Sequence, residues 1–216
     1  MTTELWSAPN IHLAVIGEDV IVLDLIADRY DCLVDAARLL HLETDGRIRA
    51  ADASIAEALI HSGIGALTPL PRARGPLVAP VRETAVCSRP NLKETIRASI
   101  ALAAGSLAFR HKSLSQLVSF QRVRIASSGA VPIDDLRLAE MVGAARRARP
   151  WIPFEGECLQ RSFQLSYFLS SRGVATDWVF GVRTWPFTAH CWLQIGDLIL
   201  GDRLERVARF TPIMKA

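Results

Sequence analysis

The chain has 216 residues, a length that allows one large domain or two small ones. Half of the residues are apolar and 22% are charged, so the composition excludes a disordered or low-complexity protein. No apolar run reaches the roughly 18–20 residues that a membrane-spanning helix needs. The segment Met1–Asn10 lacks the basic residues that open a secretory signal, so we expect a cytoplasmic protein.

The charges are divided unevenly along the chain. Residues 1–90 carry 8 basic and 12 acidic side chains, whereas residues 91–216 carry 17 basic and 10 acidic ones. The resulting net charges of −4 and +7 fit two units better than one. Arg146, Arg147 and Arg149 lie close together, and we expect them to stabilise the end of a helix rather than to bind nucleic acid.

The cysteines form no C-x-x-C pair, so neither a structural zinc site nor a dithiol redox motif is indicated. In a cytoplasm they stay reduced, and we expect no metal or other cofactor. The four cysteines are Cys32, Cys87, Cys158 and Cys191.

The first third of the chain predicts strands followed by helices. Apolar residues alternate over Ile11–Val15, and further strands are predicted at Val20–Leu23 and Tyr30–Leu33. Helical spacing over Leu33–Leu40 predicts a helix, and a second helix is predicted at about Ser54–His61. The sequence therefore predicts a small α+β unit.

Prolines and glycines interrupt every periodic pattern between Thr68 and Pro90, so this segment is either a linker or a long connection that lies over the surface. We place the linker between two domains at residues 81–90. Helical periods then return in three segments. These predicted helices are Leu92–Leu107, Ser113–Val123 and Ile133–Ala148.

The last third combines one helix with several strands. The predicted helix Cys158–Ser171 is closed by Gly173, and the tight turn Gly196-Asp197 joins the last two predicted strands. The predicted strands are Ala175–Val182, His190–Ile195 and Leu198–Asp202.

Cys158 has the position of a nucleophile. A cysteine in the first turn of a helix faces unpaired N–H groups and the positive end of the helix dipole, and both favour the thiolate. The alternative is that a free cysteine packs as a small hydrophobe, since this is among the most buried residue types. The irregular segment before Cys158, with its proline and glycine, exposes the helix start and favours a reactive thiol.

His190 and Asp202 complete a possible Cys–His–Asp arrangement. His190 lies 32 residues after Cys158, and Asp202 lies 12 residues after His190, across the predicted turn. In a tight hairpin the partner position of His190 is residue 203, so a diagonal neighbour or a small bulge brings the Asp202 carboxylate to the imidazole. A thiolate, a base and a carboxylate that fixes the tautomer of the base are the groups of nucleophilic catalysis.

Each of these residues also has a structural interpretation. His190 alone could be a half-buried histidine of the core, and Asp202 alone a solvated residue at a strand end. Cys191 adjoins His190 but alternates to the opposite face of the strand, so we expect it to pack rather than react.

A resemblance to a known family is carried by Cys158–Gly173, Phe180–Arg183, Phe187–Trp192 and Asp202. Together they resemble the transglutaminase-like cysteine peptidase domain of lasso-peptide maturation B proteins. The order of helix with Cys, strand with His and strand with Asp also matches this papain/transglutaminase-related core. The segment Gly17–Tyr30 is similar to the leader-recognition domains of peptide-maturation systems, which have a winged-helix shape.

The resemblance implies an α+β protein with a winged-helix-like leader-recognition domain at residues 1–80, a linker at 81–90 and a papain/transglutaminase-like cysteine peptidase domain at 91–216. It implies an enzyme that binds the leader of a ribosomally synthesised lasso-peptide precursor, cleaves the leader from the core and frees the core amine. A partner synthetase of the asparagine-synthetase-like type would use that amine to close a macrolactam. By this resemblance Cys158 attacks the scissile carbonyl, His190 transfers the proton and Asp202 orients His190.

The leader is expected to add a strand at an exposed edge near Tyr30–Leu33. The alternative is that Tyr30 and Leu33 are core residues. The short interval Leu42–Ser54 between the helical stripes leaves little room for a middle helix of the recognition fold. The side chains expected to contact the leader are Leu23, Tyr30, Leu33 and Leu59.

Two other functions stay open from the sequence. The same three residues can transfer an acyl group to an amine, as an amide-forming transglutaminase does, because the thioester intermediate is common to hydrolysis and acyl transfer. The third possibility is a non-catalytic adaptor that binds the leader, which a missing member of the Cys–His–Asp set would favour.

Overall fold

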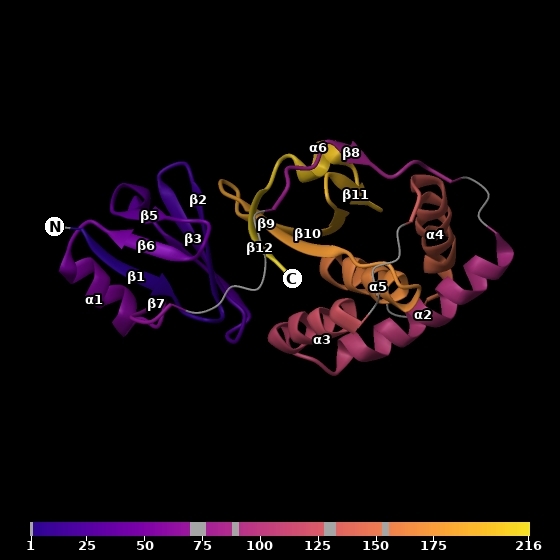
Figure 1. The fold of residues 1–216 in the computed structure, drawn as a ribbon, viewed down its shortest axis with the longest axis horizontal. Helices are drawn as coiled ribbons and strands as arrows, with labels where there is room; N and C mark the ends of the chain where they lie inside the picture. Colours follow the sequence, from indigo (N-terminus) through magenta and orange to yellow (C-terminus); the bar gives the residue numbers. More distant parts are fainter. Residues whose placement is uncertain (1, 70–76, 88–90, 128–132, 153–155) are drawn as a thin grey trace. The chain divides into compact units, whose positions relative to one another are not determined.

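The computed structural model describes residues 2–69, 77–87, 91–127, 133–152 and 156–216 (Figure 1). The chain divides into two compact units. The first comprises Met1–Pro76 with Val182–Thr188 and Thr211–Met214, and the second comprises Leu77–Gly181, Ala189–Phe210 and Lys215–Ala216. Helices and strands are mixed, which agrees with the predicted α+β class. None of the described helices has the length and apolar character needed to cross a membrane.

The N-terminal unit contains two antiparallel sheets. One has the strand order β5-β6-β1-β7, and the other is the meander β2-β3-β4, in which β3 is buried along its length. The predicted strands of residues 11–33 are thereby confirmed. The strands are β1 (Thr3–Ser7), β2 (Ile11–Ile16), β3 (Asp19–Asp24), β4 (Arg29–Leu33), β5 (Leu40–Leu42), β6 (Arg47–Ala50) and β7 (Gly65–Ala66).

Helix α1 (Ala53–His61) confirms the helix predicted at Ser54–His61. Asp52 caps it, because its Oδ1 accepts a hydrogen bond from the Ile55 N–H at 3.0 Å. The helix buries Ala56 and Leu59 in a core that also contains residues of β1, β3 and β6. Its amphipathic face therefore holds α1 against the sheets.

The prediction of a helix over Leu33–Leu40 is wrong. Asp35 has a left-handed backbone with φ 57°, which interrupts a helical path, and only the 3-10 turn Ala36–Arg38 follows it. Leu40 then enters strand β5, which pairs with β6. In the described part of this unit α1 is the one α-helix, so the winged-helix shape implied by the resemblance is not confirmed.

The second half of the chain builds a five-stranded sheet and a group of helices. The strand order is β12-β9-β10-β11-β8, with β10 and β11 antiparallel and β11 and β8 parallel. The strands are β8 (Arg82–Glu83), β9 (Asp177–Arg183), β10 (Thr188–Ile195), β11 (Leu198–Leu200) and β12 (Thr211–Lys215). The helices are α2 (Leu92–Arg110), α3 (Leu114–Ser127), α4 (Asp135–Ala148), the 3-10 turn Arg149–Trp151, α5 (Cys158–Ser171) and α6 (Leu204–Val207).

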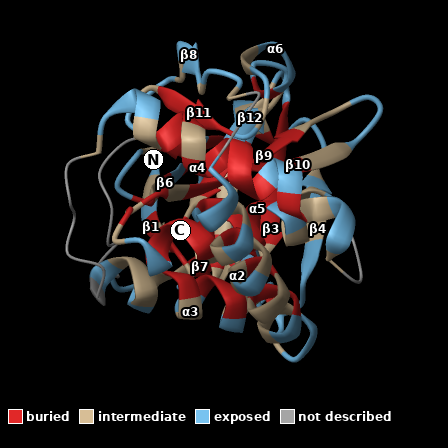
Figure 2. Cartoon of the chain, turned by 90° about the vertical axis from the view of Figure 1, so that its right-hand side faces the viewer, coloured by how far each residue is buried: buried red, intermediate tan, exposed pale blue. Residues whose placement is uncertain are grey.

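Helix α5 is the centre of this helical group, since α2, α3 and α4 all pack against it. It confirms the predicted span, and Gly173 follows it with φ 79°. The apolar residues Phe163, Phe168 and Leu169 are completely buried, and Figure 2 shows strands β9 and β11 mostly buried as well. Because α5 is packed on several sides, its first residue is held in a fixed position.

Part of the predicted linker at residues 81–90 belongs to the sheet instead. Strand β8 pairs with β11, and the Thr84 N–H donates to the Ile199 carbonyl at 2.9 Å. Arg82 reinforces this pairing through an ion pair with Asp197 at 2.9 Å. The predicted linker is therefore wrong over 81–84, and its residues 88–90 lie outside the described part of the chain.

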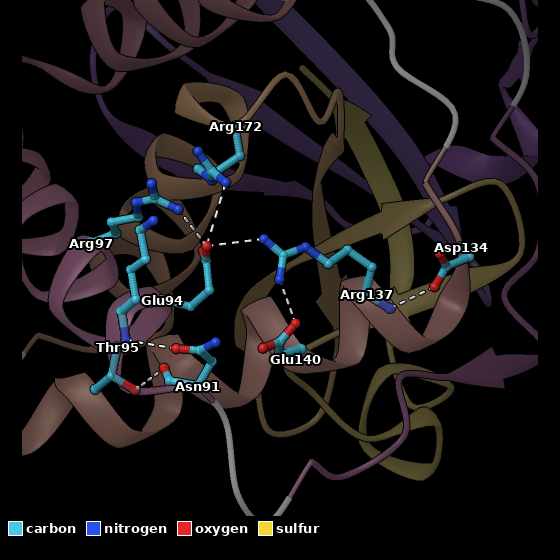
Figure 3. A network of polar contacts seen from close by, with 9 residues as sticks. Asn91, Glu94, Thr95, Arg97, Asp134, Arg137, Glu140 and Arg172 are labelled. Carbon is cyan, nitrogen blue, oxygen red and sulfur yellow. Dashed lines mark hydrogen bonds and ion pairs between the residues drawn. The ribbon is translucent and has the colours of Figure 1, made fainter.

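A buried carboxylate connects helices α2 and α4 with Arg172, the residue that ends α5 (Figure 3). The Glu94 side chain of α2 is 4% exposed and contacts Arg97 at 2.7 Å, Arg137 of α4 at 3.0 Å and Arg172 at 3.5 Å. Burial raises the pKa of Glu94, but hydrogen bonds from Arg97 and Arg137 outweigh it and hold this pKa below its ordinary value. The cluster fixes the end of α5 relative to α2 and α4.

Candidate active site

Cys158 is the first residue of α5 and is half-buried. The preceding residue, Glu157, has an extended backbone and makes no side-chain cap, so the first N–H groups of the helix are left without a capping side chain. The thiol is thus placed at the positive end of the helix dipole, as the sequence predicts.

His190 and Asp202 meet beside this thiol. His190 Nε2 lies 2.6 Å from Asp202 Oδ2, and Asp202 Oδ1 accepts a second hydrogen bond from the Arg203 N–H at 2.8 Å. Because Nε2 is taken by Asp202, the ring nitrogen that hydrogen-bonds Cys158 is Nδ1. The structure therefore brings Cys158, His190 and Asp202 together, and we call them the candidate triad.

The hairpin between β10 and β11 brings Asp202 to His190. Its register pairs Ile195 with Leu198 and Leu193 with Leu200, centred on the predicted turn, where Gly196 has φ 56°. The ladder ends at Leu200, and Gly201 then adopts φ 72°, a left-handed backbone that favours glycine. Asp202 follows Gly201 directly, and its carboxylate meets the imidazole there.

The electrostatics of the candidate triad favour a thiolate–imidazolium pair. Hydrogen bonds from Cys191 and His190 outweigh burial and lower the pKa of Cys158 to about 4. Burial lowers the pKa of His190, but the hydrogen bonds to Asp202 and Cys158 outweigh burial and raise this pKa to about 9. Between these values Cys158 carries the negative charge and His190 the positive one.

Cys191 takes part in this site, contrary to the packing role expected from strand alternation. It is 4% exposed, and both its thiol and its backbone N–H donate hydrogen bonds to the Cys158 sulfur. Burial and the neighbouring Cys158 charge raise the pKa of Cys191 well above its ordinary value. Cys191 thus stays protonated and acts as a donor to the thiolate.

A buried serine is hydrogen-bonded to the first turn of α5. Ser162 lies one turn after Cys158, and its hydroxyl donates to the Cys158 carbonyl at 2.7 Å. The same hydroxyl accepts a hydrogen bond from Trp178 Nε1 of β9 at 2.8 Å. This chain of contacts connects the nucleophile's backbone to the sheet. The spacing of four residues was visible in the sequence, whereas the contact with Trp178 was not.

Aromatic rings enclose His190. The ring centroid of Trp192, also on β10, lies 6.2 Å from that of His190, and the ring centroid of Phe210 lies 5.1 Å from it. Trp192 Nε1 donates to Gln194 Oε1 at 3.0 Å, which fixes the indole. The imidazole is 9% exposed, so the rings shield its ion pair with Asp202 from water.

The candidate triad lines a small cavity of about 160 Å³. A carbonyl group placed there can meet the Cys158 sulfur, with the Cys158 N–H at the helix start available to a developing oxyanion. Arg149, Arg161 and Arg206 are also among the lining residues. The described residues contain no group of His, Cys, Asp and Glu side chains with the arrangement of a metal site. The arrangement is suited to nucleophilic attack on an acyl carbon.

Comparison with known protein families identifies the family of the chain. A family model described as the transglutaminase-like superfamily matches residues 101–215, more than half of the chain. The chain belongs to the transglutaminase-like superfamily. All three members of the candidate triad lie inside the matched region of this transglutaminase-like protein.

A shorter similarity concerns a peptide-processing protein. Over 49 residues the chain is 39% identical to the microcin J25-processing protein McjB of Escherichia coli, and this match covers 23% of the chain and 24% of McjB. The chain is thus matched to about a quarter of that relative's length. This similarity supports the resemblance to lasso-peptide maturation B proteins. No solved structure gives a significant match.

The residues predicted to contact a leader lie in the N-terminal unit. Tyr30 and Leu33 are on β4, an edge strand among the described residues, and both are partly exposed. Leu23 is on the central strand and 0% exposed, and Leu59 is on α1 and 7% exposed. Tyr30 and Leu33 are therefore the two members of this set with accessible surface, and leader contact stays a prediction.

Proposed function

We propose that this transglutaminase-like protein is a cysteine peptidase that removes the leader from a ribosomally synthesised lasso-peptide precursor. The observation that carries the proposal is the candidate triad. Its cysteine is at a helix start, with Cys191 and His190 as donors to its sulfur, and His190 in turn is held by Asp202 at 2.6 Å. The similarity to a microcin-processing protein supports a peptide as the substrate.

In the proposed reaction the Cys158 thiolate attacks the scissile carbonyl carbon, and the oxyanion accepts a hydrogen bond from the Cys158 N–H. The His190 imidazolium gives its proton to the leaving amine as the C–N bond breaks, which releases the core and leaves a thioester with the leader. His190, now neutral, takes a proton from water, and the hydroxide attacks the thioester. The C–S bond breaks, and the thiolate and imidazolium are restored.

The N-terminal unit is proposed to hold the leader. Strand β4 leaves one backbone edge without a strand partner among the described residues, so an extended leader can pair there with its main chain. Tyr30 and Leu33 on that strand then contact the apolar side chains of the leader. We keep residues 1–80 as the proposed recognition domain and residues 91–216 as the proposed peptidase domain, in a cytoplasmic protein.

The proposed partner is a macrolactam synthetase of the asparagine-synthetase-like type, which would consume the freed amine of the core. The first experiment is intact mass spectrometry of a cognate lasso-peptide precursor incubated with the protein, with and without that synthetase. Hydrolysis predicts separate leader and core masses that together exceed the precursor by one water. An amine adduct on the leader would contradict hydrolysis and identify acyl transfer. An unchanged precursor in both mixtures would leave a binding adaptor.

A further inference from the structure

A second cavity, of about 620 Å³, lies beside the cavity of the candidate triad. We call it the arginine pocket, because five arginines line it. They come from the last turn of α4, from the 3-10 turn after α4 and from the segment that follows β11 (Figure 1). They are Arg146, Arg149, Arg203, Arg206 and Arg209.

The two cavities are adjacent and share part of their walls. Arg149, Gly201, Asp202 and Arg206 line both of them. A peptide with its scissile carbonyl at Cys158 therefore has the arginine pocket within reach of the residues next to that bond. The arginine pocket can therefore bind substrate side chains while the bond at Cys158 is cleaved.

The acidic side chains that line the pocket already have contacts within the protein. Glu83 accepts the Leu204 N–H at 2.8 Å, Glu205 pairs with Arg209 at 2.8 Å, and Asp202 holds His190. Five arginines therefore face three carboxylates that are already engaged. The pocket has an excess of positive charge in a concave site, where field lines are concentrated.

Two of the arginines have no carboxylate partner in the part of the chain that the structure describes. Arg146 and Arg203 are exposed, and neither forms an ion pair there. Neither side chain is needed to hold the fold, since surface charges contribute little to stability. A role in stabilising the end of α4 is open to Arg146, but does not explain Arg203, which precedes α6.

We propose that the arginine pocket binds acidic side chains of the peptide substrate close to the scissile bond. Guanidinium groups bind carboxylates through paired hydrogen bonds, and a planar fork gives this contact a defined geometry. The inference rests on the proposed peptidase function, since it deepens the specificity of the same site. It predicts a substrate with Asp or Glu within a few residues of the cleaved bond.

A binding measurement tests the pocket without requiring cleavage. Hexaglutamate and hexaglutamine are titrated into the full-length Cys158→Ala protein by calorimetry at low salt. We expect hexaglutamate to bind and hexaglutamine not to bind. The double variant Arg146→Gln, Arg203→Gln should weaken hexaglutamate binding by about tenfold or more, the size expected for losing hydrogen bonds between charged groups. Arg147→Gln is the matched control, since Arg147 is adjacent on α4 and lines neither cavity.

A kinetic measurement then places the acidic residue on the substrate. Precursor peptides in which Asp or Glu near the cleavage site is changed to Asn or Gln should show a higher KM and an unchanged kcat. The Arg146→Gln, Arg203→Gln protein should show the same change with the unaltered peptide. When the altered protein acts on the altered peptide, the rise in KM should be smaller than the product of the two separate rises, because both changes remove the same interaction.

Equal binding of the two hexapeptides would overturn the proposal, as would unchanged hexaglutamate binding in the double variant. Binding of inorganic phosphate without hexaglutamate would also contradict it, because the pocket would then select a compact anion. The binding proposal and the peptidase proposal can be contradicted independently. If the protein cleaves the precursor but does not bind hexaglutamate, only the proposal for the arginine pocket is wrong. If hexaglutamate binds through the arginines but no precursor is cleaved, the peptidase proposal is wrong.

Discussion

His190 Nε2 lies 2.6 Å from Asp202 Oδ2, although Asp202 lies beyond the last ladder pair of the hairpin that carries His190. Gly201, with a left-handed φ of 72°, stands between the end of β11 and Asp202. The contact leaves the other ring nitrogen for Cys158. The chemistry of the site depends on the charge of this imidazole.

The rate of cleavage should fall at both acidic and alkaline pH, which gives the pH profile two limbs. Below about 4 the Cys158 thiolate is protonated and loses its nucleophilicity, and above about 9 the His190 imidazolium loses the proton that the leaving amine needs. We expect kcat/KM for the precursor to have a plateau between these limbs. A profile that rises only above pH 8, as for an ordinary thiol with a pKa of about 8.5, would contradict the ion pair.

Asp202→Asn should move the alkaline limb to lower pH. The Asp202 carboxylate raises the pKa of His190 by hydrogen bond and by charge, and asparagine keeps the size but removes the charge. The plateau should therefore narrow from its alkaline side, and its height should fall because the ring is less well oriented. The pH profile of the variant is the measurement, and an alkaline limb that does not move would refute the role given to Asp202.

Cys191→Ala should raise the pKa of Cys158. The Cys191 thiol is the largest contribution to its low pKa, and alanine removes this donor while the backbone N–H stays. Alkylation of Cys158 by iodoacetamide, followed by peptide mapping at several pH values, measures the change. Cys191→Ser keeps a donor and serves as the matched control, with a smaller shift expected. Identical alkylation profiles for alanine and wild type would show that Cys191 only packs.

Glu94→Gln should destabilise the helical group by about 2 kcal/mol, because Glu94 makes charged hydrogen bonds in a buried position. The pKa of Glu94 is lowered in the folded protein, so this contribution is complete above the ordinary value of 4.5 and is lost as pH falls through the lower folded value. Denaturant unfolding at neutral and acidic pH measures the difference between wild type and variant.

Glu140→Gln is the control for this prediction. Glu140 pairs with Arg137 of the same cluster but is more exposed, so we expect a loss below about 1 kcal/mol. Equal losses for the two variants at neutral pH would mean that burial of Glu94 contributes nothing.

Much of the transglutaminase-like half could be predicted from the sequence, because its signals are local. The helical period predicted the bounds of α5, and the Gly196-Asp197 turn predicted the hairpin that carries His190 on one strand and ends shortly before Asp202. The N-terminal half was harder, since short strands such as β5 and β7 have too few residues for a period. There the left-handed backbone at Asp35 is followed by a short turn and a strand, where the sequence predicts a helix.

The parts of the site that the sequence did not predict depend on tertiary contacts. Strand alternation placed Cys191 away from His190, but both residues reach Cys158 because the thiol at the helix start contacts the strand at adjacent positions. Likewise the arginines of the second cavity come from three segments of the chain. No spacing rule could have joined Arg146 to Arg203.

The most direct test of the central claim is cleavage of the precursor in water labelled with heavy oxygen, comparing wild type with Cys158→Ala. With wild type we expect one heavy oxygen atom in the new carboxylate of the leader. We expect no cleavage with Cys158→Ala, whose affinity for the precursor should be unchanged. Labelled leader formed by Cys158→Ala at the wild-type rate would contradict the account, because water would then attack without the thiolate.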